Sequence, residues 1–168
     1  MYEEAQATVV PLQQLTFALA GEEYGVDILA VREIRGWSHV TRIPQTPDYV
    51  LGVLNLRGAI VPVMDLRLRF GLVRENYNAT TVMIIVAIGK RLFGIVVDGV
   101  SDVIDIDPAA VTPVPDLGAA VDTEYLQGFT THDERMVMLL DVEKLMCSAD
   151  VKTLDAALPG VRDVEVAV

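Results

Sequence analysis

The sequence predicts a mostly β fold built from two similar small β-barrels of about five strands each, with a short helix and a C-terminal helix. Three observations support this prediction. Short apolar runs rich in Val, Ile and Leu recur between Gly, Pro and Asp breaks along the 168 residues. One strand–turn–strand unit, within 50–71, is followed by a short helical pattern. The same plan then recurs in the second half of the chain, as an internal repeat.

The first half begins with a tail and two strands. Residues 1–13 show no apolar periodicity and are expected to be a disordered tail. Leu15, Phe17 and Leu19 alternate with Thr16 and Ala18, which indicates a half-buried strand. The chain then returns as a longer strand over Tyr24–Ile34, interrupted around Ile28–Ala30.

A predicted hairpin follows in the first half. Two apolar runs, Val50–Leu56 and Ala59–Leu66, flank Arg57-Gly58, and glycine accepts the positive φ of a tight turn. Asp65 is a good N-cap and Gly71 suits the residue after a helix, so a short helix closes the unit. Asn55 and Arg57 are polar residues at the tip, and we expect them to be presented to solvent. A buried hairpin with no further role is the alternative.

The second half repeats this plan. Tyr24-Gly25-Val26 matches Phe93-Gly94-Ile95, and Tyr49–Leu66 aligns without gaps on Tyr125–Val142. We therefore expect one domain over 14–154, with a first barrel over 14–78, a second over 79–142, a C-terminal helix over 142–154 and a flexible tail over 155–168. Interleaving of the two barrels is left open. The identical pairs are Tyr49/Tyr125, Gly52/Gly128, Val61/Val137 and Asp65/Asp141.

The two hairpin tips differ in charge. Asn55, Arg57 and Gly58 of the first copy correspond to Thr131, Asp133 and Glu134 of the second. Opposite charges at equivalent tips indicate two different contact surfaces, although drift between the copies would give the same pattern.

Charge and composition exclude some classes of function. A net charge of −11 argues against nucleic-acid binding, which needs a basic footprint. Over 32–74, however, seven Arg face three acidic residues, so either a basic face steers an acidic partner or these arginines are scattered. No apolar run approaches the ~20 residues of a membrane helix, and no signal peptide opens the chain. A single Cys147 fits a reducing cytoplasm.

No catalytic or cofactor pattern is visible. The only histidines, His39 and His132, lack partners at metal-ligand spacing, and there is no glycine-rich phosphate loop. We expect no metal, no cofactor and no enzyme. A small β-barrel enzyme that uses backbone groups is the alternative from another class.

Several ordered motifs resemble one known family. NLRG, followed by IVPVMDLR and RFG, is similar to the CheW adaptor family of bacterial chemotaxis. The resemblance extends through EEYGVDILAVREIRG, FGIVVDGVSDV and TEYLQG, and covers about Leu15 to Leu145. It implies Src-homology-3-like barrels in a non-enzymatic cytoplasmic adaptor that is recruited to membrane-associated chemoreceptor arrays.

The resemblance also implies partners. The adaptor would join the cytoplasmic tip of methyl-accepting chemoreceptors to the regulatory domain of a CheA-type histidine kinase, without inserting into the membrane. Self-association in arrays is left open. The alternative within the family is an adaptor of a pilus or another non-flagellar sensory system.

The contact residues are assigned on the same basis. Glu33 and Arg57 are expected to flank a groove lined by Val31, Ile34 and Leu56. Thr112 and an exposed Leu117 are expected to contact the kinase, with core anchoring as the alternative for Leu117. Trp37 is interpreted as a lid on the core in preference to a binding hot spot. The expected receptor-binding residues are Val31, Glu33, Ile34, Asn55, Leu56, Arg57 and Gly58.

Overall fold

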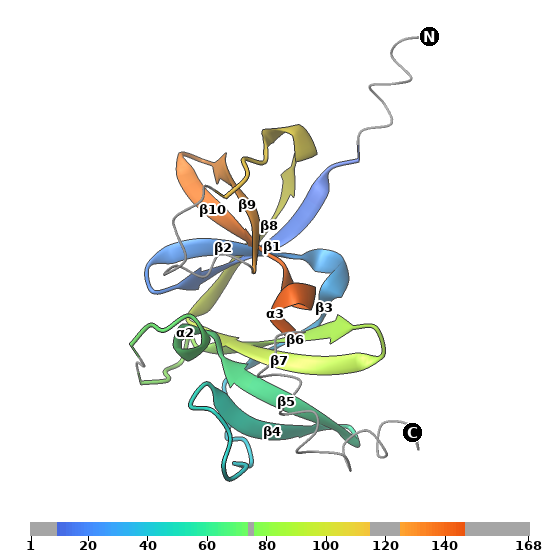
Figure 1. Ribbon diagram of the computed structural model, residues 1–168, viewed down its shortest axis with the longest axis vertical. Coiled ribbons are helices and arrows are strands. Elements are labelled where there is room, and N and C mark those ends of the chain that lie inside the picture. Colours follow the sequence, from blue (N-terminus) through green and yellow to red (C-terminus); the bar gives the residue numbers. More distant parts are fainter. Residues whose placement is uncertain (1–9, 74–75, 115–124, 147–168) are drawn as a thin grey trace.

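The computed structural model describes residues 10–73, 76–114 and 125–146. They form two five-stranded sheets, one above the other in Figure 1, and the prediction of a mostly β fold is confirmed. The upper sheet has the strand order β8-β1-β2-β10-β9, and the lower sheet has the order β3-β6-β7-β5-β4. The strands are β1 (Leu12–Leu19), β2 (Glu22–Asp27), β3 (Val31–Gly36), β4 (Val50–Leu56), β5 (Ala59–Asp65), β6 (Val82–Ile88), β7 (Arg91–Val97), β8 (Gly99–Ile106), β9 (Leu126–His132) and β10 (Arg135–Leu140).

Each sheet takes strands from both halves of the chain. The upper sheet combines β1 and β2 with β8, β9 and β10, so blue and orange strands lie together in Figure 1. The lower sheet combines β6 and β7 with β3, β4 and β5. The two barrels expected over 14–78 and 79–142 therefore do not correspond to the two sheets, because the halves of the chain interleave. The expected break at Ile28–Ala30 is a 3₁₀ turn, η1, at which the chain leaves the upper sheet for the lower one.

In each sheet, one isolated β-bridge links the two opposite edges. In the lower sheet, Thr41 lies beyond the end of β3 and pairs with Val53 of β4. In the upper sheet, Thr112 lies beyond the end of β8 and pairs with Phe129 of β9. In each sheet, the segment that follows one edge strand is therefore linked to the opposite edge strand, which is consistent with an Src-homology-3-like fold.

Glycine allows the close approach at both bridges. A Cβ at Gly52 would lie 2.0 Å from the carbonyl oxygen of Thr41, and a Cβ at Gly128 would lie 2.6 Å from that of Thr112. Their φ angles of +145° and +158° also disfavour other residues. The identity of this pair in the two repeats therefore has a structural cause.

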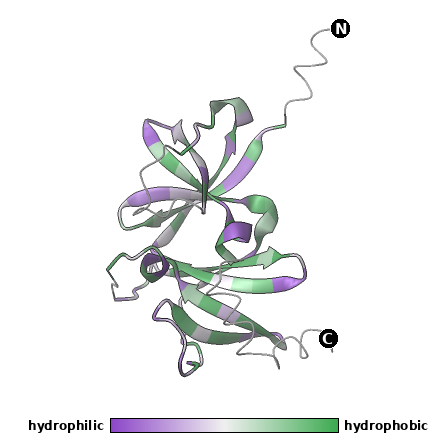
Figure 2. Ribbon diagram, in the orientation of Figure 1, coloured by the Kyte–Doolittle hydropathy of each residue, from purple (hydrophilic) through white to green (hydrophobic). Residues whose placement is uncertain are grey.

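The largest apolar cluster is shared by the two sheets. It includes Phe17 and Val26 from the upper sheet and Ile84 and Ile95 from the lower sheet. A second cluster, which includes Leu56, fills the inside of the lower sheet, and a smaller third cluster lies inside the upper sheet. Figure 2 shows the lower strands coloured largely as hydrophobic, whereas the upper sheet has more hydrophilic segments.

The helices are short. Helix α2 (Leu66–Arg69) begins after Asp65, whose Oδ1 accepts from the backbone N–H groups of Arg67 and Leu68, so the predicted cap is confirmed. Helix α3 is Val142–Met146, and the rest of the helix predicted over 142–154 lies outside the described residues. The tail expected over 1–13 is too long by two residues, because β1 begins at Leu12. Within the described ranges, no helix is long and apolar enough to cross a membrane.

Arg67 on α2 links the two sheets through Asp98. Its guanidinium donates to both carboxylate oxygens of Asp98, at 2.7 Å and 2.5 Å. The same carboxylate accepts from the backbone N–H of Ala20, at the β1–β2 turn. Partial burial acts to raise the pKa of Asp98, but the hydrogen bonds from Arg67 and Ala20 outweigh it and hold the pKa below its ordinary value.

Candidate functional site

The β4–β5 hairpin ends in a two-residue turn at Arg57 and Gly58. Both have positive φ, +51° and +93°, which is typical of the tight turns that match the twist of a hairpin. Asn55 supports the turn, because its Oδ1 accepts from the N–H of Gly58 at 3.0 Å. Asn55 is exposed, and the side chain of Arg57 is 72% exposed, so the tip is presented to solvent as expected.

Arg57 is paired with Glu33. Its Nη2 lies 2.8 Å from Oε1 of Glu33, and Arg35 donates to Oε2 of the same carboxylate at 3.0 Å. The hydrogen bond from Arg57 is the main reason that the pKa of Glu33 lies below its ordinary value, and the bond from Arg35 adds to it. Glu33 is therefore ionised at neutral pH and held between two arginines.

A bulge in β3 determines which side chains share a face. Val31 pairs with Val86 and Glu33 pairs with Ile85, so Arg32 has no partner in the ladder. Residues paired across neighbouring strands point to the same side of a sheet. Ile34, opposite Ile84, therefore lies with Val31 on the side of the shared core, and Glu33 lies on the other side.

The expected groove lined by Val31, Ile34 and Leu56 is not formed. Leu56 is only 5% exposed and belongs to the cluster inside the lower sheet. Val31 packs against the shared core instead, and Ile34 is 45% exposed. Leu56 alternates with the exposed Asn55, so its side chain points inward, and it supports the tip without being available to a partner.

Leu29 and Val103 are among the exposed apolar residues that the sequence analysis did not single out. Val103 on β8 is 45% exposed and pairs with the buried Leu15, so it also lies on the side of the shared core. Leu29 is 80% exposed in η1, which contacts one strand of each sheet. The repeat contained a signal for Val103, since it aligns with Ile34. We call Leu29, Ile34 and Val103 the apolar rim.

The second hairpin tip is acidic. Asp133 and Glu134 form the β9–β10 turn with φ of +50° and +66°, so both tips have the same kind of turn with opposite charge. Asp133 lies 3.5 Å from Nε2 of His132. Arg135 lies 3.9 Å from Glu23 beside a hollow of about 180 Å³.

Only one of the two expected kinase-contact residues is described. Thr112 is exposed, and its backbone exchanges hydrogen bonds of 2.8 Å and 2.9 Å with Phe129 in the upper sheet. Leu117 lies outside the described residues. Trp37 is half-buried and packs on Tyr77 with 4.3 Å between ring centroids, over the cluster of the lower sheet, as a lid would.

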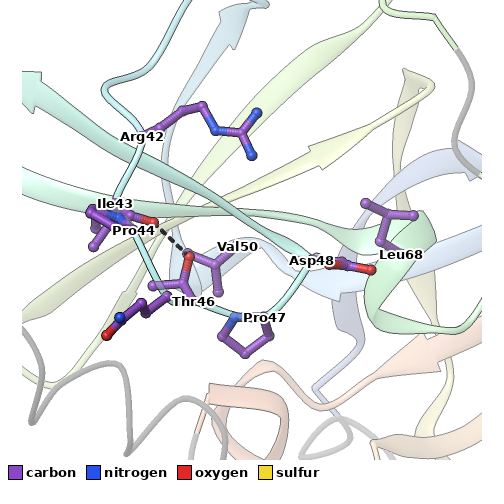
Figure 3. Close-up of a pocket in the computed structure, with 9 residues that line it drawn as sticks. Arg42, Ile43, Pro44, Thr46, Pro47, Asp48, Val50 and Leu68 are labelled. Carbon is purple, nitrogen blue, oxygen red and sulfur yellow. Dashed lines mark hydrogen bonds between the residues drawn. The ribbon is translucent and has the colours of Figure 1, made fainter.

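A hollow of about 680 Å³ lies along the loop between β3 and β4 (Figure 3). It is lined by residues 42–48 with Val50 and Leu68, and Thr46 donates to the carbonyl of Ile43 at its edge. Neither a histidine nor a cysteine is among these residues. Across 10–73, 76–114 and 125–146, no three His, Cys, Asp or Glu side chains gather as metal ligands do. The polar groups that stand out are those of Glu33 and Arg57, which suit binding.

Comparison with known proteins agrees with the motifs. The family model described as CheW-like domain matches residues 13–150. The chain is 48% identical to the chemotaxis protein CheW of Klebsiella aerogenes over 141 residues, which are 84% of this chain and 85% of the relative. It is 34% identical to the probable chemotaxis protein CheW of Rhizobium etli, over 81% of this chain and 88% of the relative.

A solved structure shares the fold. The crystal structure of the scaffolding protein TtCheW from Thermoanaerobacter tengcongensis matches with a TM-score of 0.77 and 35% identity. The match covers 84% of this chain and 96% of that one.

Proposed function

The chain belongs to the CheW-like domain family, and we propose on that premise that it is a non-enzymatic adaptor of a chemotaxis array. In this proposal it works in the cytoplasm and joins the cytoplasmic tip of chemoreceptors to the regulatory domain of a CheA-type histidine kinase. The observation that carries the proposal is the family match over 13–150. The chain also matches relatives named chemotaxis protein CheW over most of their length.

The receptor contact is proposed for the end of the lower sheet that carries Glu33 and Arg57. The ion pair holds the Arg57 side chain in place above Glu33, which lowers the conformational entropy that Arg57 loses on binding. Ile34 follows Glu33 in the chain but lies on the other face of β3, where it is 45% exposed. Exposed apolar side chains close to charged ones are typical of protein–protein contacts.

The kinase contact is proposed for the upper sheet. Thr112 is exposed and held by two backbone hydrogen bonds to β9, so it offers a rigid edge. Leu117 belongs to the same proposal on the basis of sequence. A receptor contact on the lower sheet and a kinase contact on the upper sheet would let both partners bind at once.

Coupling requires more than simultaneous binding. An adaptor that binds equally well to both states of a receptor leaves the kinase equilibrium unchanged. The proposed contacts must therefore differ in strength between receptor states. The strength of a contact at the Glu33–Arg57 pair can differ between receptor states, because a charged group of the receptor can compete for either residue only when it lies close to the pair.

The test is reconstitution with purified components. The protein, a CheA-type kinase and receptor-containing membranes are mixed, and autophosphorylation of the kinase is measured with and without attractant. We expect kinase activity to rise only when all three are present and to fall when attractant is added. Activity that is independent of the adaptor contradicts the proposal.

Two further arms separate the alternatives. Kinase and receptors of a non-flagellar system replace the flagellar ones in a parallel assay, and preferential activation there would assign the protein to that system. The purified protein is also incubated alone with ATP. Turnover of ATP by the protein alone contradicts the non-enzymatic assignment.

A further inference from the structure

The two hairpins that carry the charged tips are joined at their bases by one side chain. Tyr49 directly precedes β4, and Tyr125 directly precedes β9. The guanidinium carbon of Arg69, on α2, lies 5.2 Å from the ring centroid of Tyr49 and 4.4 Å from that of Tyr125. Arg69 also donates to the hydroxyl of Tyr125. One cation therefore contacts the same tyrosine position of both repeats.

Both tyrosines are fixed within their own hairpins. The carbonyl of Tyr49 accepts from the N–H of Asp65, which ends β5, and that of Tyr125 accepts from the N–H of Asp141, which follows β10. Both rings are buried, with exposed fractions of 9% and 7%. Each tyrosine is therefore tied to both strands of its own hairpin, directly by the chain and through this hydrogen bond. Arg69 contacts one hairpin of the lower sheet and one of the upper sheet.

Only the first of the two repeats has an arginine at this position of its helix. Helix α3 is the counterpart of α2, and Leu145 stands in it where α2 has Arg69. Leu145 is fully buried in the shared core. A leucine is thus accepted at this point of the fold, so packing alone does not require an arginine on α2.

Arg69 carries a cost for the fold. Its Nε is buried and finds no acceptor within the described part of the chain. A buried donor without a partner costs free energy of folding, and this cost opposes the gain from the two ring contacts. The clearest consequence of Arg69 is therefore the link that it makes between the two hairpins.

We propose that Arg69 is a positioning residue that fixes the hairpin of Arg57 relative to the hairpin of Asp133. The consequence for signalling rests on the proposed function, because an adaptor transmits a signal only if its two contact surfaces keep a defined position relative to each other. If the relative position of the two surfaces varies, each partner still binds, but the binding of one has a weaker effect on the other.

The first test measures the geometry directly and does not depend on any partner. Nitroxide labels are attached at Arg57→Cys and Asp133→Cys in a Cys147→Ser background, and the distance distribution between them is measured with and without Arg69→Met. We expect a narrow distribution that Arg69→Met broadens. Arg91→Met is the matched control, since Arg91 also lies over an aromatic ring, 5.6 Å from the centroid of Phe93, but here the arginine and the ring belong to one strand, β7.

The second test measures coupling in the chain without labels. Arg69→Met should keep the wild-type melting temperature and the separate affinities for receptor and kinase, while receptor-dependent kinase activation falls about tenfold, within the usual range of coupling between sites. Tyr125→Phe keeps the ring and removes only the hydroxyl, so it should give a smaller loss and remains testable if Arg69→Met does not fold.

The outcomes are distinct. An unchanged distance distribution in Arg69→Met overturns the inference, as does a fall in melting temperature that accounts for the loss of activation. If the wild-type protein does not stimulate the kinase, the proposed function fails, whereas the distance measurement still decides whether Arg69 fixes the two hairpins.

Discussion

Glu33 and Arg57 form an ion pair between the two opposite outer strands of the lower sheet. Glu33 lies on β3 at one end of the strand order, and Arg57 follows β4 at the other end. Their contact at 2.8 Å and the separate bridge between Thr41 and Val53 join the two edges of this sheet. The proposed receptor contact therefore lies where the two edges of the lower sheet are joined.

The first prediction concerns Arg57. Asn tolerates the positive φ of the turn, so Arg57→Asn should change the free energy of unfolding by less than about 0.5 kcal/mol. Receptor-dependent kinase activation should fall strongly, because a binding-site arginine can contribute ~2 kcal/mol or more. Melting curves and the reconstituted kinase assay are run on the same preparations.

A double-mutant cycle with Glu33→Gln tests whether the pair acts as one unit. The double variant should lose less activation free energy than the sum of the single variants, because each change already disables the same contact. Asp133→Asn, at the equivalent turn position of the other hairpin, is the matched control for receptor binding and should leave it unchanged. Strict additivity, or wild-type activation in Arg57→Asn, contradicts the assignment.

The second prediction concerns the bridges that bring the outer strands together. Gly52→Ala and Gly128→Ala should each destabilise the fold by at least ~2 kcal/mol, because the added Cβ meets a backbone carbonyl and the φ is unfavourable. Gly36→Ala is the control, since nothing lies within 4 Å of its Cβ position. Urea denaturation measures all three, and equal effects at Gly36 and Gly52 would show that this argument is wrong.

Local sequence patterns predicted the hairpins and caps well. Arg57-Gly58 indicated a tight turn, and Asp65 indicated the start of a helix, because both features depend on a few neighbouring residues. The inward direction of Leu56 was also available from its alternation with Asn55, but the groove hypothesis did not use it.

Other features depend on contacts between distant segments. The break at Ile28–Ala30 was predicted, yet nothing in the pattern says which sheet the following strand joins. The bulge at Arg32, which places Ile34 beside Val31, follows from the pairing with β6 and has no local signature. The contact of Arg69 with Tyr49 and Tyr125 likewise exists only once both hairpins have been placed.

The third prediction concerns acid stability. The pKa of Asp98 lies below its ordinary value of 3.8, so the folded state takes up this proton less readily than the unfolded state. Its stabilising contribution is therefore fully present above the ordinary value and is lost as the pH falls through the lower folded pKa. The free energy of unfolding should fall more steeply below about pH 4 in the wild type than in Asp98→Asn.

Denaturant unfolding at a series of pH values measures this difference. Asp98→Asn leaves Arg67 without its carboxylate and should be less stable at neutral pH, so the slope with pH decides the test and the absolute stability does not. Identical slopes for the two proteins would mean that the Arg67–Asp98 pair does not contribute to acid unfolding.

The last prediction concerns the apolar rim. Ile34 is 45% exposed, so Ile34→Ser should lower the melting temperature much less than a serine substitution at a fully buried residue of the shared core. If a receptor covers this side chain, the same change should weaken receptor binding about tenfold, since the apolar area is then removed from water only in the complex. Met136→Ser is the matched control, because Met136 is 54% exposed but lies on β10 of the upper sheet. Co-sedimentation with receptor-containing membranes measures binding of both variants. Equal binding by the two would remove Ile34 from the receptor contact, and a large fall in melting temperature for Ile34→Ser would assign it to the shared core.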